Sequence, residues 1–328
     1  MRVRFSLLAL AIPFFSCNSD HKNDHPAYHD PAVQVFSDSI AQHGDDPQLL
    51  FRRAEALSSI NQDSLALIDV MAATKLDSLN AQYLYTIGYL HLKLQHPGKA
   101  IEALKRNLDV APGNVNVRLL LSKAYLANGD INGALSETNK VLAAAPGHVE
   151  ARFSLAQIKA AQKDLPAAIT IAKGLLAENK NNYTVSYQLA DWYRAGGNPE
   201  AIQQYQQTFR IDTNNVDPLF EIGEFYQEEN HPEAAKQAYR ACIMSSLDYT
   251  DAYLQTGKIL YGQDSTEKAL RQFNIAISTA PDNAEAYLYK GLSFQKLNLK
   301  DSARTALRQA LAFDPESVAA KKALKAIQ

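Results

Sequence analysis

The sequence of 328 residues predicts an all-α fold, a superhelical solenoid of antiparallel helix pairs with a capping helix at each end. Two ladders of small residues carry this prediction. The first consists of alanines spaced by 34, 34, 34, 33, 34, 34 and 34 residues, namely Ala66, Ala100, Ala134, Ala168, Ala201, Ala235, Ala269 and Ala303. The second lies twelve residues ahead of most of them and comprises Ala54, Gly88, Ser122, Ala156, Ala190, Gly223, Gly257 and Gly291. A small residue at a fixed period predicts that two backbones approach each other once per repeat.

The segments between the ladders have the features of helical hairpins. Leu84, Ile87 and Leu90, for example, recur at helical spacing. Residue types that tolerate the left-handed conformation at a helix end lie mid-repeat, at Asn61, Gly129, Gly197, Asn230, Asp264 and Asn298. Prolines that stop the second helices are Pro112, Pro146, Pro281 and Pro315. The single short spacing falls at residues 196–199, so we expect a deletion in a turn that leaves both helices intact.

Eight repeats are in register, and they begin at Pro47, Ala81, Val115, Val149, Tyr183, Val216, Thr250 and Ala284. Repeat 8 resembles the consensus of the tetratricopeptide repeat, with Tyr287 in place of the usual Trp, followed by Gly291, Phe294, Ala303, Leu307, Ala310 and Pro315. The resemblance covers residues 47–317. It implies a tetratricopeptide-repeat solenoid whose function resides on its surface.

The two ends of the array differ from the full repeats. Residues 31–46 form an N-terminal half repeat, with a lone second helix expected at 31–43. Residues 318–328 are expected to form a lone first helix that caps the stack, with Val318, Leu324 and Ile327 facing inward. Lys325 occupies the small-residue position of this helix, where it would prevent a further helix from docking.

Two repeats depart from the usual pattern. Repeat 1 has Arg53 and Ser78 at positions that are usually apolar or proline, and repeat 4 has Arg152, Lys159 and Lys180. We expect these two repeats to dock less firmly than the others.

The N-terminus resembles a bacterial lipoprotein signal. Arg2 and Arg4 precede an apolar segment, residues 5–15, which is too short to span a membrane as a helix. The pair Ser16–Cys17 resembles a lipobox, which implies a signal peptide at 1–16 and diacylation of Cys17. Plain secretion with a free Cys17 is the alternative. We therefore expect a lipid-anchored protein of the bacterial cell envelope, at the outer membrane, facing either the periplasm or the cell surface.

Residues 17–30 are polar and predict a disordered tether between the lipid and the solenoid. His21, His25 and His29 recur every four residues among aspartates, and three imidazoles on one helical face would bind zinc or copper. Pro26 and the polar composition oppose a helix. We therefore favour the tether over the metal site and expect no cofactor.

Composition and motifs argue against several classes of function. A formal net charge of −2 is unlike that of a protein that binds a nucleic-acid backbone. The sequence contains no P-loop, GxGxxG, HExxH, GxSxG or CxxC motif, so we expect no enzyme activity. Cys242 and Trp192 occupy positions that other repeats fill with small or apolar residues, and both are expected in the core.

The family resemblance implies that positions 2, 5, 9 and 12 of each repeat line a concave groove. Position 5 is apolar or aromatic in all eight repeats, which suits an extended peptide or a partner helix. The expected partner-binding residues are Phe51, Tyr85, Tyr89, Leu119, Phe153, Tyr187, Phe220, Glu224, Leu254 and Leu288. The alternative is that position 5 packs between neighbouring repeats.

Repeat 6 carries an acidic patch on one predicted helical face. Its members, Asp217, Glu221, Glu224 and Glu228, are spaced by four, three and four residues. Like charges in this arrangement repel, and a basic ligand segment would stabilise them. The alternative is a solvated acidic face.

Together these features predict a non-enzymatic protein–protein interaction adaptor of the bacterial cell envelope. It would bind a protein or peptide partner in the groove and the membrane through its lipid, and would not bind nucleic acid. The alternative is a structural subunit of an envelope assembly or secretion machine that uses its convex surface.

Overall fold

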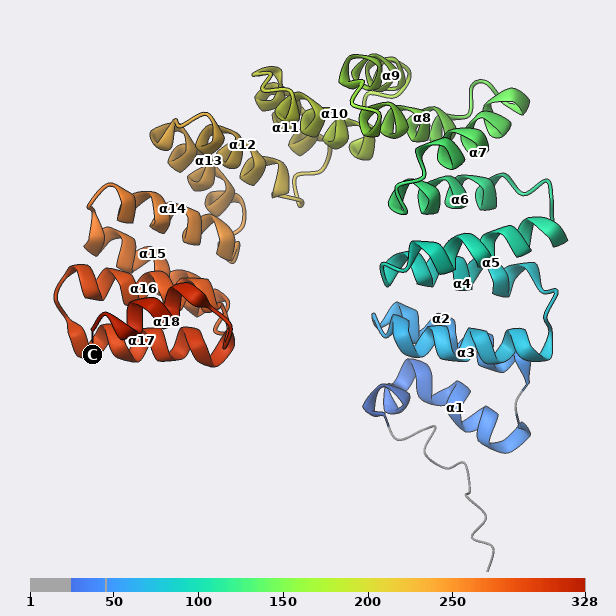
Figure 1. Ribbon diagram of the computed structural model, residues 1–328, viewed down its shortest axis with the longest axis horizontal. Helices are drawn as coiled ribbons and strands as arrows, with labels where there is room; N and C mark the ends of the chain where they lie inside the picture. The colour runs from blue at the N-terminus through green and yellow to red at the C-terminus, as the bar shows by residue number, and fades with distance from the viewer. Residues whose placement is uncertain (1–24, 45, 328) are drawn as a thin grey trace, which may run out of the picture. The chain divides into compact units, whose positions relative to one another are not determined.

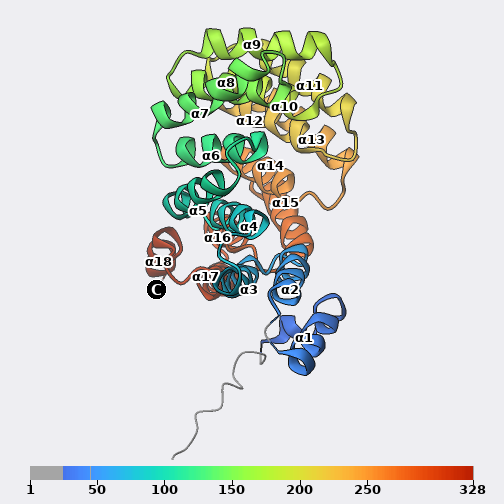
Figure 2. The same ribbon diagram turned by 90° about the vertical axis from the view of Figure 1, so that its right-hand side faces the viewer.

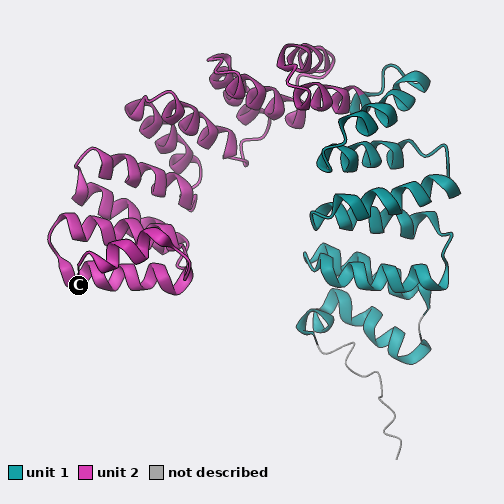
Figure 3. Ribbon diagram, in the orientation of Figure 1, with its two compact units in different colours: residues 1–151 teal, residues 152–328 magenta. Residues whose placement is uncertain are grey.

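The computed structural model describes residues 25–44 and 46–327. Over this part of the chain it contains eighteen α-helices, one 3-10 helix and no β-strand, which confirms the all-α prediction. The chain divides into two compact units, residues 1–151 and 152–328, shown in separate colours in Figure 3. The boundary between the two units falls inside α8 (Val149–Ala161).

Unit 1 is a stack of antiparallel helical hairpins. Its elements are η2 (Pro26–His29), α1 (Pro31–His43), α2 (Pro47–Ser59), α3 (Asp63–Leu76), α4 (Ala81–Lys93), α5 (Pro97–Val110), α6 (Val115–Ala127) and α7 (Ile131–Ala144). Figures 1 and 2 show the pairs α2/α3, α4/α5 and α6/α7 as successive layers, with α1 against the first. Each layer is one repeat, and the second helix of one layer packs on the first helix of the next, α3 on α4 and α5 on α6.

Unit 2 continues with the same hairpin in repeats 5 to 8. Its helices after α8 are α9 (Leu165–Glu178), α10 (Tyr183–Ala195), α11 (Glu200–Ile211), α12 (Asp217–Glu228), α13 (Pro232–Ser245), α14 (Thr250–Gly262), α15 (Thr266–Thr279), α16 (Ala284–Lys296), α17 (Lys300–Phe313) and α18 (Val318–Lys325). The short helix α18 packs on α17 and closes this unit.

The turns inside the hairpins have the backbone conformation that the sequence predicts. All six residues singled out for mid-repeat turns have positive φ angles between 57° and 78°. Repeats 2 and 4 reach the same conformation with Gln95 (φ 59°) and Lys163 (φ 65°). The sequence did not indicate these two because neither residue type favours a left-handed backbone.

The two ladders of small residues meet inside each hairpin. The Ser122 hydroxyl donates a hydrogen bond of 2.9 Å to the carbonyl of Ala134, which is the close approach that the sequence predicts. At the glycines, however, the space is taken by a side chain of the second helix. A β-carbon on Gly88 would lie 2.5 Å from Leu104 Cγ, and one on Gly257 would lie 2.5 Å from Phe273 Cε1. The glycines therefore make room for a large side chain that lies sixteen residues later in the sequence. The close approach of two backbones, which the sequence predicts, explains only part of the small-residue pattern.

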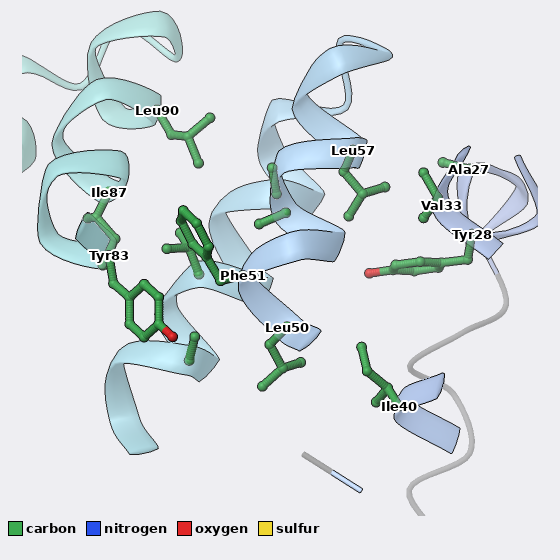
Figure 4. Packing of buried hydrophobic residues seen from close by; sticks show 14 of the residues in the cluster. Ala27, Tyr28, Val33, Ile40, Leu50, Phe51, Leu57, Tyr83, Ile87 and Leu90 are labelled. Carbon is green, nitrogen blue, oxygen red and sulfur yellow. The ribbon is translucent and has the colours of Figure 1, made fainter. Parts of the chain in front are cut away.

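The first described residues are ordered, which corrects the prediction of a disordered tether for residues 25–30. Pro26–His29 form η2, and Ala27 and Tyr28 are buried. Figure 4 shows Tyr28 with Val33 and Ile40 of α1, facing Leu50 and Leu57 of α2. The prediction failed because it relied on the polar composition of the whole segment, whereas two of its residues, Ala27 and Tyr28, pack in the core of repeat 1. Residues 17–24 lie outside the described part of the chain.

The two arginines that appeared to weaken their repeats have carboxylate partners. Arg53 is buried and forms two hydrogen bonds to Asp69, of 2.6 and 2.8 Å, while the Tyr28 ring lies 4.7 Å from its guanidinium. Arg152 donates to Glu178 at 2.7 Å. Arg53 therefore does not leave an uncompensated charge in repeat 1, since a buried charge is tolerated where it is paired and hydrogen-bonded.

The core includes both residues that were assigned to it, since Cys242 and Trp192 are buried. At the C-terminal end the prediction is wrong for Val318, which is 78% exposed because it is the first residue of α18 and lies beyond the contact with α17. Ile327 is buried and Leu324 packs against the same cluster. Within residues 25–44 and 46–327, none of the helices combines the length and apolar character that crossing a membrane requires.

Replacing Gly257 tests the packing that links the two ladders. We expect Gly257→Ala to lower the free energy of unfolding by about 1–3 kcal/mol, because the new methyl group overlaps Phe273. The measurement is the urea midpoint of the full chain followed by circular dichroism. Gly262→Ala, at the end of the same helix, is the matched control because its β-carbon meets open space, and it should be neutral or stabilising by up to about 1 kcal/mol. Equal midpoints for the two variants would contradict the packing argument.

Candidate interaction surface

The first helices of the repeats present a common face, here called the first-helix face, made of positions 5, 9 and 12. These positions are four and three residues apart, so their side chains lie on one side of each helix. Most of the predicted groove residues keep some accessible surface. Tyr89 is 43% exposed, and the half-buried residues are Tyr85, Leu119, Phe153, Tyr187, Phe220, Glu224 and Leu288.

The assignment to a binding groove is wrong for Phe51 and Leu254. These side chains are only 5% and 4% exposed. The Phe51 ring packs 5.0 Å from the ring of Tyr83, which belongs to the next repeat, and Leu254 packs in a cluster with Phe273. At these two positions the alternative reading holds, because position 5 contacts neighbouring side chains and has little surface left for a ligand.

In unit 1 the first-helix face is apolar with cationic neighbours. Tyr85 and Tyr89 are one turn apart on α4, and Leu119 lies on α6. The Lys93 ammonium group lies 5.9 Å from the centre of the Tyr89 ring and pairs with Asp63 at 2.8 Å. The exposed edge of Tyr89 is therefore the most accessible aromatic surface among the predicted groove residues.

In repeats 5 and 6 of unit 2, tyrosine hydroxyls on the same face donate to carboxylates. Tyr205 donates to Asp191 at 2.7 Å, and Tyr239 donates to Glu224 at 2.5 Å. Each pair joins position 9 of a first helix to a buried ring of the second helix in the same repeat. Burial raises the pKa of the Tyr205 and Tyr239 hydroxyls, so both stay protonated and act as donors. Burial also raises the pKa of Asp191, against the lowering effect of the Tyr205 hydrogen bond.

The acidic patch of α12 is compensated within the chain. Arg194 of α10 pairs with Glu221 and donates from Nε to Glu228 at 2.9 Å. Tyr249 donates to Asp217 at 2.9 Å. The hydrogen bond from Arg194 lowers the pKa of Glu228. Burial raises the pKa of Glu221, although Arg194 acts in the opposite direction.

Both readings of the acidic patch therefore need correction. It is not a freely solvated face, and an external basic segment is not required to neutralise the pair Glu221 and Glu228. Arg194 was missed because its partners lie 27 and 34 residues away, in the next repeat. The tyrosine–carboxylate pairs were detectable in principle, since repeats 5 and 6 both combine an acidic residue at position 9 with a tyrosine at the equivalent site of the second helix.

The structure also bears on the proposed metal ligands. His25 and His29 are exposed, and the Nδ1 atom of His25 accepts a hydrogen bond from the Ala27 amide. Among the residues that the structure describes, no three His, Cys, Asp or Glu side chains are grouped as metal ligands. Cys17 and His21 lie outside these residues.

A polar pocket of about 530 Å³ lies between the end of α11 and the turn after α13. It is lined by Asp212, Asn214, Asn215, Val216, Asp217, Ser246, Asp248 and Tyr249. All three of its carboxylates already accept internal hydrogen bonds, Asp212 from the Asn214 backbone amide, Asp217 from Tyr249 and Asp248 from Ser246. The pocket is therefore largely satisfied by the protein's own donors.

Stacked hairpins that display their side chains along successive first helices define a helical-repeat protein. Models of the tetratricopeptide repeat match residues 91–156, 126–189, 216–249 and 254–318. The chain belongs to the tetratricopeptide repeat family. Proteins built from this repeat bind protein partners and are generally non-enzymatic scaffolds.

Several solved structures are similar to the chain. The C-terminal part of a tetratricopeptide protein from Cytophaga hutchinsonii is 18% identical with a TM-score of 0.54, over 73% of this chain and 99% of that one. A tetratricopeptide protein from Parabacteroides merdae is 15% identical with a TM-score of 0.49, over 75% and 98%. MamA is 25% identical with a TM-score of 0.43, over 49% and 95%. The similarity to the Cytophaga protein supports the fold alone. A comparison with curated protein sequences found no match.

Removing Arg194 tests the electrostatics of this face. We expect Arg194→Ala to lower the free energy of unfolding by about 1–3 kcal/mol at pH 7, because Glu221 and Glu228 lose their charged donor. The lowered pKa of Glu228 means that its pairing stabilises the fold above the unfolded pKa of about 4.3 and is lost as the pH falls through the folded pKa. Protonation of Glu221 also relieves the unpaired charge. The loss should therefore shrink on acidification, which urea denaturation at pH 7 and pH 4 would measure.

The matched control is Lys321→Ala, which removes a pair with Glu316 whose members are both more than half exposed. This variant should change the free energy of unfolding by less than about 0.5 kcal/mol. A penalty for Arg194→Ala that is the same at both pH values would rule out the charge pairing as its source.

Proposed function

We propose that this protein is an adaptor that binds an extended peptide or a helix of a partner protein along the first-helix face, and that it is held at a bacterial envelope membrane through Cys17. The observation that carries the proposal is the accessible aromatic surface of α4, where Tyr89 is 43% exposed above the half-buried Tyr85. Exposed aromatic side chains in a repeat array are suited to act as binding anchors, since aromatic residues dominate interface energies.

The two units offer different chemistry to a partner. In unit 1 the face combines Tyr85, Tyr89 and Leu119 with the cation of Lys123, which suits an apolar segment with polar flanks. In repeats 5 and 6 of unit 2 the face is a set of hydrogen-bonded tyrosines and carboxylates around Arg194. Because these donors and acceptors are engaged with each other and Tyr89 is the most exposed aromatic side chain among the predicted groove residues, we assign the apolar anchoring contact to unit 1.

The envelope location rests on the sequence of the N-terminus. Arg2, Arg4, the apolar residues 5–15 and the pair Ser16–Cys17 support export followed by lipidation. These residues lie outside the described part of the chain. Acyl chains on Cys17 would then hold the repeats close to a bilayer.

A photo-crosslinking amino acid at position 89 tests the binding surface. We expect it to capture a partner from envelope membranes, because position 89 has accessible surface in the unbound protein. The crosslinked peptide identifies the bound segment, which is then synthesised and titrated against the purified chain. Tyr89→Ala should weaken its binding by about 5–30-fold, the loss expected for an aromatic anchor of 1–2 kcal/mol. Tyr85→Ala should weaken it to a similar degree.

Phe313→Ala is the matched control, since Phe313 is a second-helix aromatic side chain of nearly equal exposure, 45%. It should leave the affinity for the peptide unchanged. If Tyr85→Ala and Tyr89→Ala bind the peptide as tightly as the unmodified chain while keeping its circular dichroism spectrum, the first-helix face is not the binding surface.

A further inference from the structure

The outer face of α3 differs from that of every other second helix. Ile68 and Met71 occupy positions 22 and 25 of repeat 1 and are 58% and 45% exposed. At position 22 the other repeats carry polar residues: Glu102, Ser136, Thr170, Gln203, Gln237, Arg271 and Thr305. At position 25 they also carry polar residues: Lys105, Asn139, Lys173, Gln206, Arg240, Asn274 and Arg308. Repeat 1 alone therefore exposes apolar side chains at both sites.

The exposed apolar surface continues to the end of the hairpin. Leu76 at the end of α3 and Leu79 in the following turn are both exposed, and we call Ile68, Met71, Leu76 and Leu79 the α3 stripe. Lys75 follows Met71 by about one turn on the same side of the helix, and Asp77 is exposed between Leu76 and Leu79. An apolar stripe with a lysine that extends to its edge has the composition of a surface that rests at a membrane interface.

The N-terminal segment enters the structure at this repeat. Tyr28 is buried and lies over Arg53, which bonds to Asp69, the residue next to Ile68. If Cys17 carries acyl chains, residues 18–24 are the whole link between the lipid and His25, the first described residue. Cys17 and His25 are eight residues apart, so the link spans at most about 29 Å when fully extended. The anchor would therefore hold the N-terminal end of unit 1, where repeat 1 lies, close to the bilayer.

We propose that the α3 stripe rests in the interfacial layer of the bilayer that holds the acylated Cys17, with its apolar side chains among the lipid chains and Lys75 at the phosphate level. This inference rests on the proposed lipid anchor. The tether keeps the stripe at a high local concentration near the lipid, so even a modest apolar contact is populated. The contact would fix which side of unit 1 faces the membrane and leave the first helices free for a partner.

Fluorescence quenching of the full, lipidated chain tests the proposal. The chain is expressed with its own signal, purified from membranes and reconstituted in vesicles of phosphatidylethanolamine and phosphatidylglycerol. Cys242 is first replaced by Ala, the residue that repeats 7 and 8 have at the same position, so that the lipidated chain has no other reactive thiol. A fluorophore is then attached at Met71→Cys or, as the matched control, at Asn139→Cys, which is position 25 of repeat 3. We expect brominated lipid to lower the emission at residue 71 about twofold and that at residue 139 by less than about a tenth.

A second variant separates insertion from misfolding. Ile68→Gln combined with Leu76→Gln makes two of the four stripe positions polar, and Gln is the residue that repeats 5 and 6 have at the position of Ile68. Quenching at residue 71 should fall to the level of residue 139, while the urea midpoint of the chain stays unchanged. Quenching that survives both substitutions would overturn the proposal.

The remaining outcomes distinguish the stripe from the anchor. Lipidated protein whose residue 71 is not quenched overturns the stripe proposal and leaves the lipid anchor standing. A third outcome is that the fluorophore at residue 71 is shielded from solvent in detergent, increasingly so at higher protein concentration, and does not respond to brominated lipid. This result would assign the stripe to a contact with a second copy of the chain, and it would also overturn the proposal. Mass spectrometry that finds no acyl group on Cys17 overturns both the anchor and the membrane contact, while the test of peptide binding remains independent.

Discussion

The fold depends on one steric relation, between a small residue on the first helix of each hairpin and the side chain sixteen residues later on the second. Where the first helix has glycine, the second helix inserts a large side chain into the vacant volume, as Leu104 does at Gly88 and Phe273 at Gly257. In repeat 3 the same pair of positions holds Ser122 and Thr138, whose hydroxyls are 2.8 Å apart. In these repeats the two helices thus fill the contact together, as close packing of protein interiors requires.

This relation separates the residues that build the hairpins from those that remain available on the helix faces. The ladder residues and the side chains that pack on them are buried between helices, so they can vary little without loss of packing. Positions 9 and 12 of the first helices and positions 22 and 25 of the second helices lie outside that contact, whereas position 5 packs beside it, as Leu254 does in a cluster with Phe273. The chain uses positions 9 and 12 for tyrosine, carboxylate and arginine contacts in unit 2, where Arg194 links α10 to α12.

The fold was predictable from the sequence because its determinants are periodic and local. The 34-residue spacing of the alanines gives the length of the repeat, and the residues suited to a left-handed backbone mark the turn inside the hairpin. The details of the surface were not predictable in the same way. The burial of Phe51 depends on the ring of Tyr83 in the next repeat, and the neutralisation of Glu228 depends on a residue 34 positions earlier. Such contacts are set by the packing of one repeat on another, and the residues involved carry no periodic signal.

In repeat 1, a residue that departs from the repeat pattern is explained in part by the segment that precedes the repeat. Arg53 replaces the aliphatic residue that repeats 2 to 6 have at the same position, and taken alone it would weaken the packing. The structure provides Asp69 as its partner and Tyr28 as its cover, and both are specific to this end of the chain. The same reasoning applies to Ile68 and Met71, the other residues at which repeat 1 departs from all its neighbours. Both side chains are exposed among the described residues of the chain, and the bilayer that the proposed lipid anchor at Cys17 would bring to repeat 1 is the apolar phase that we propose covers them.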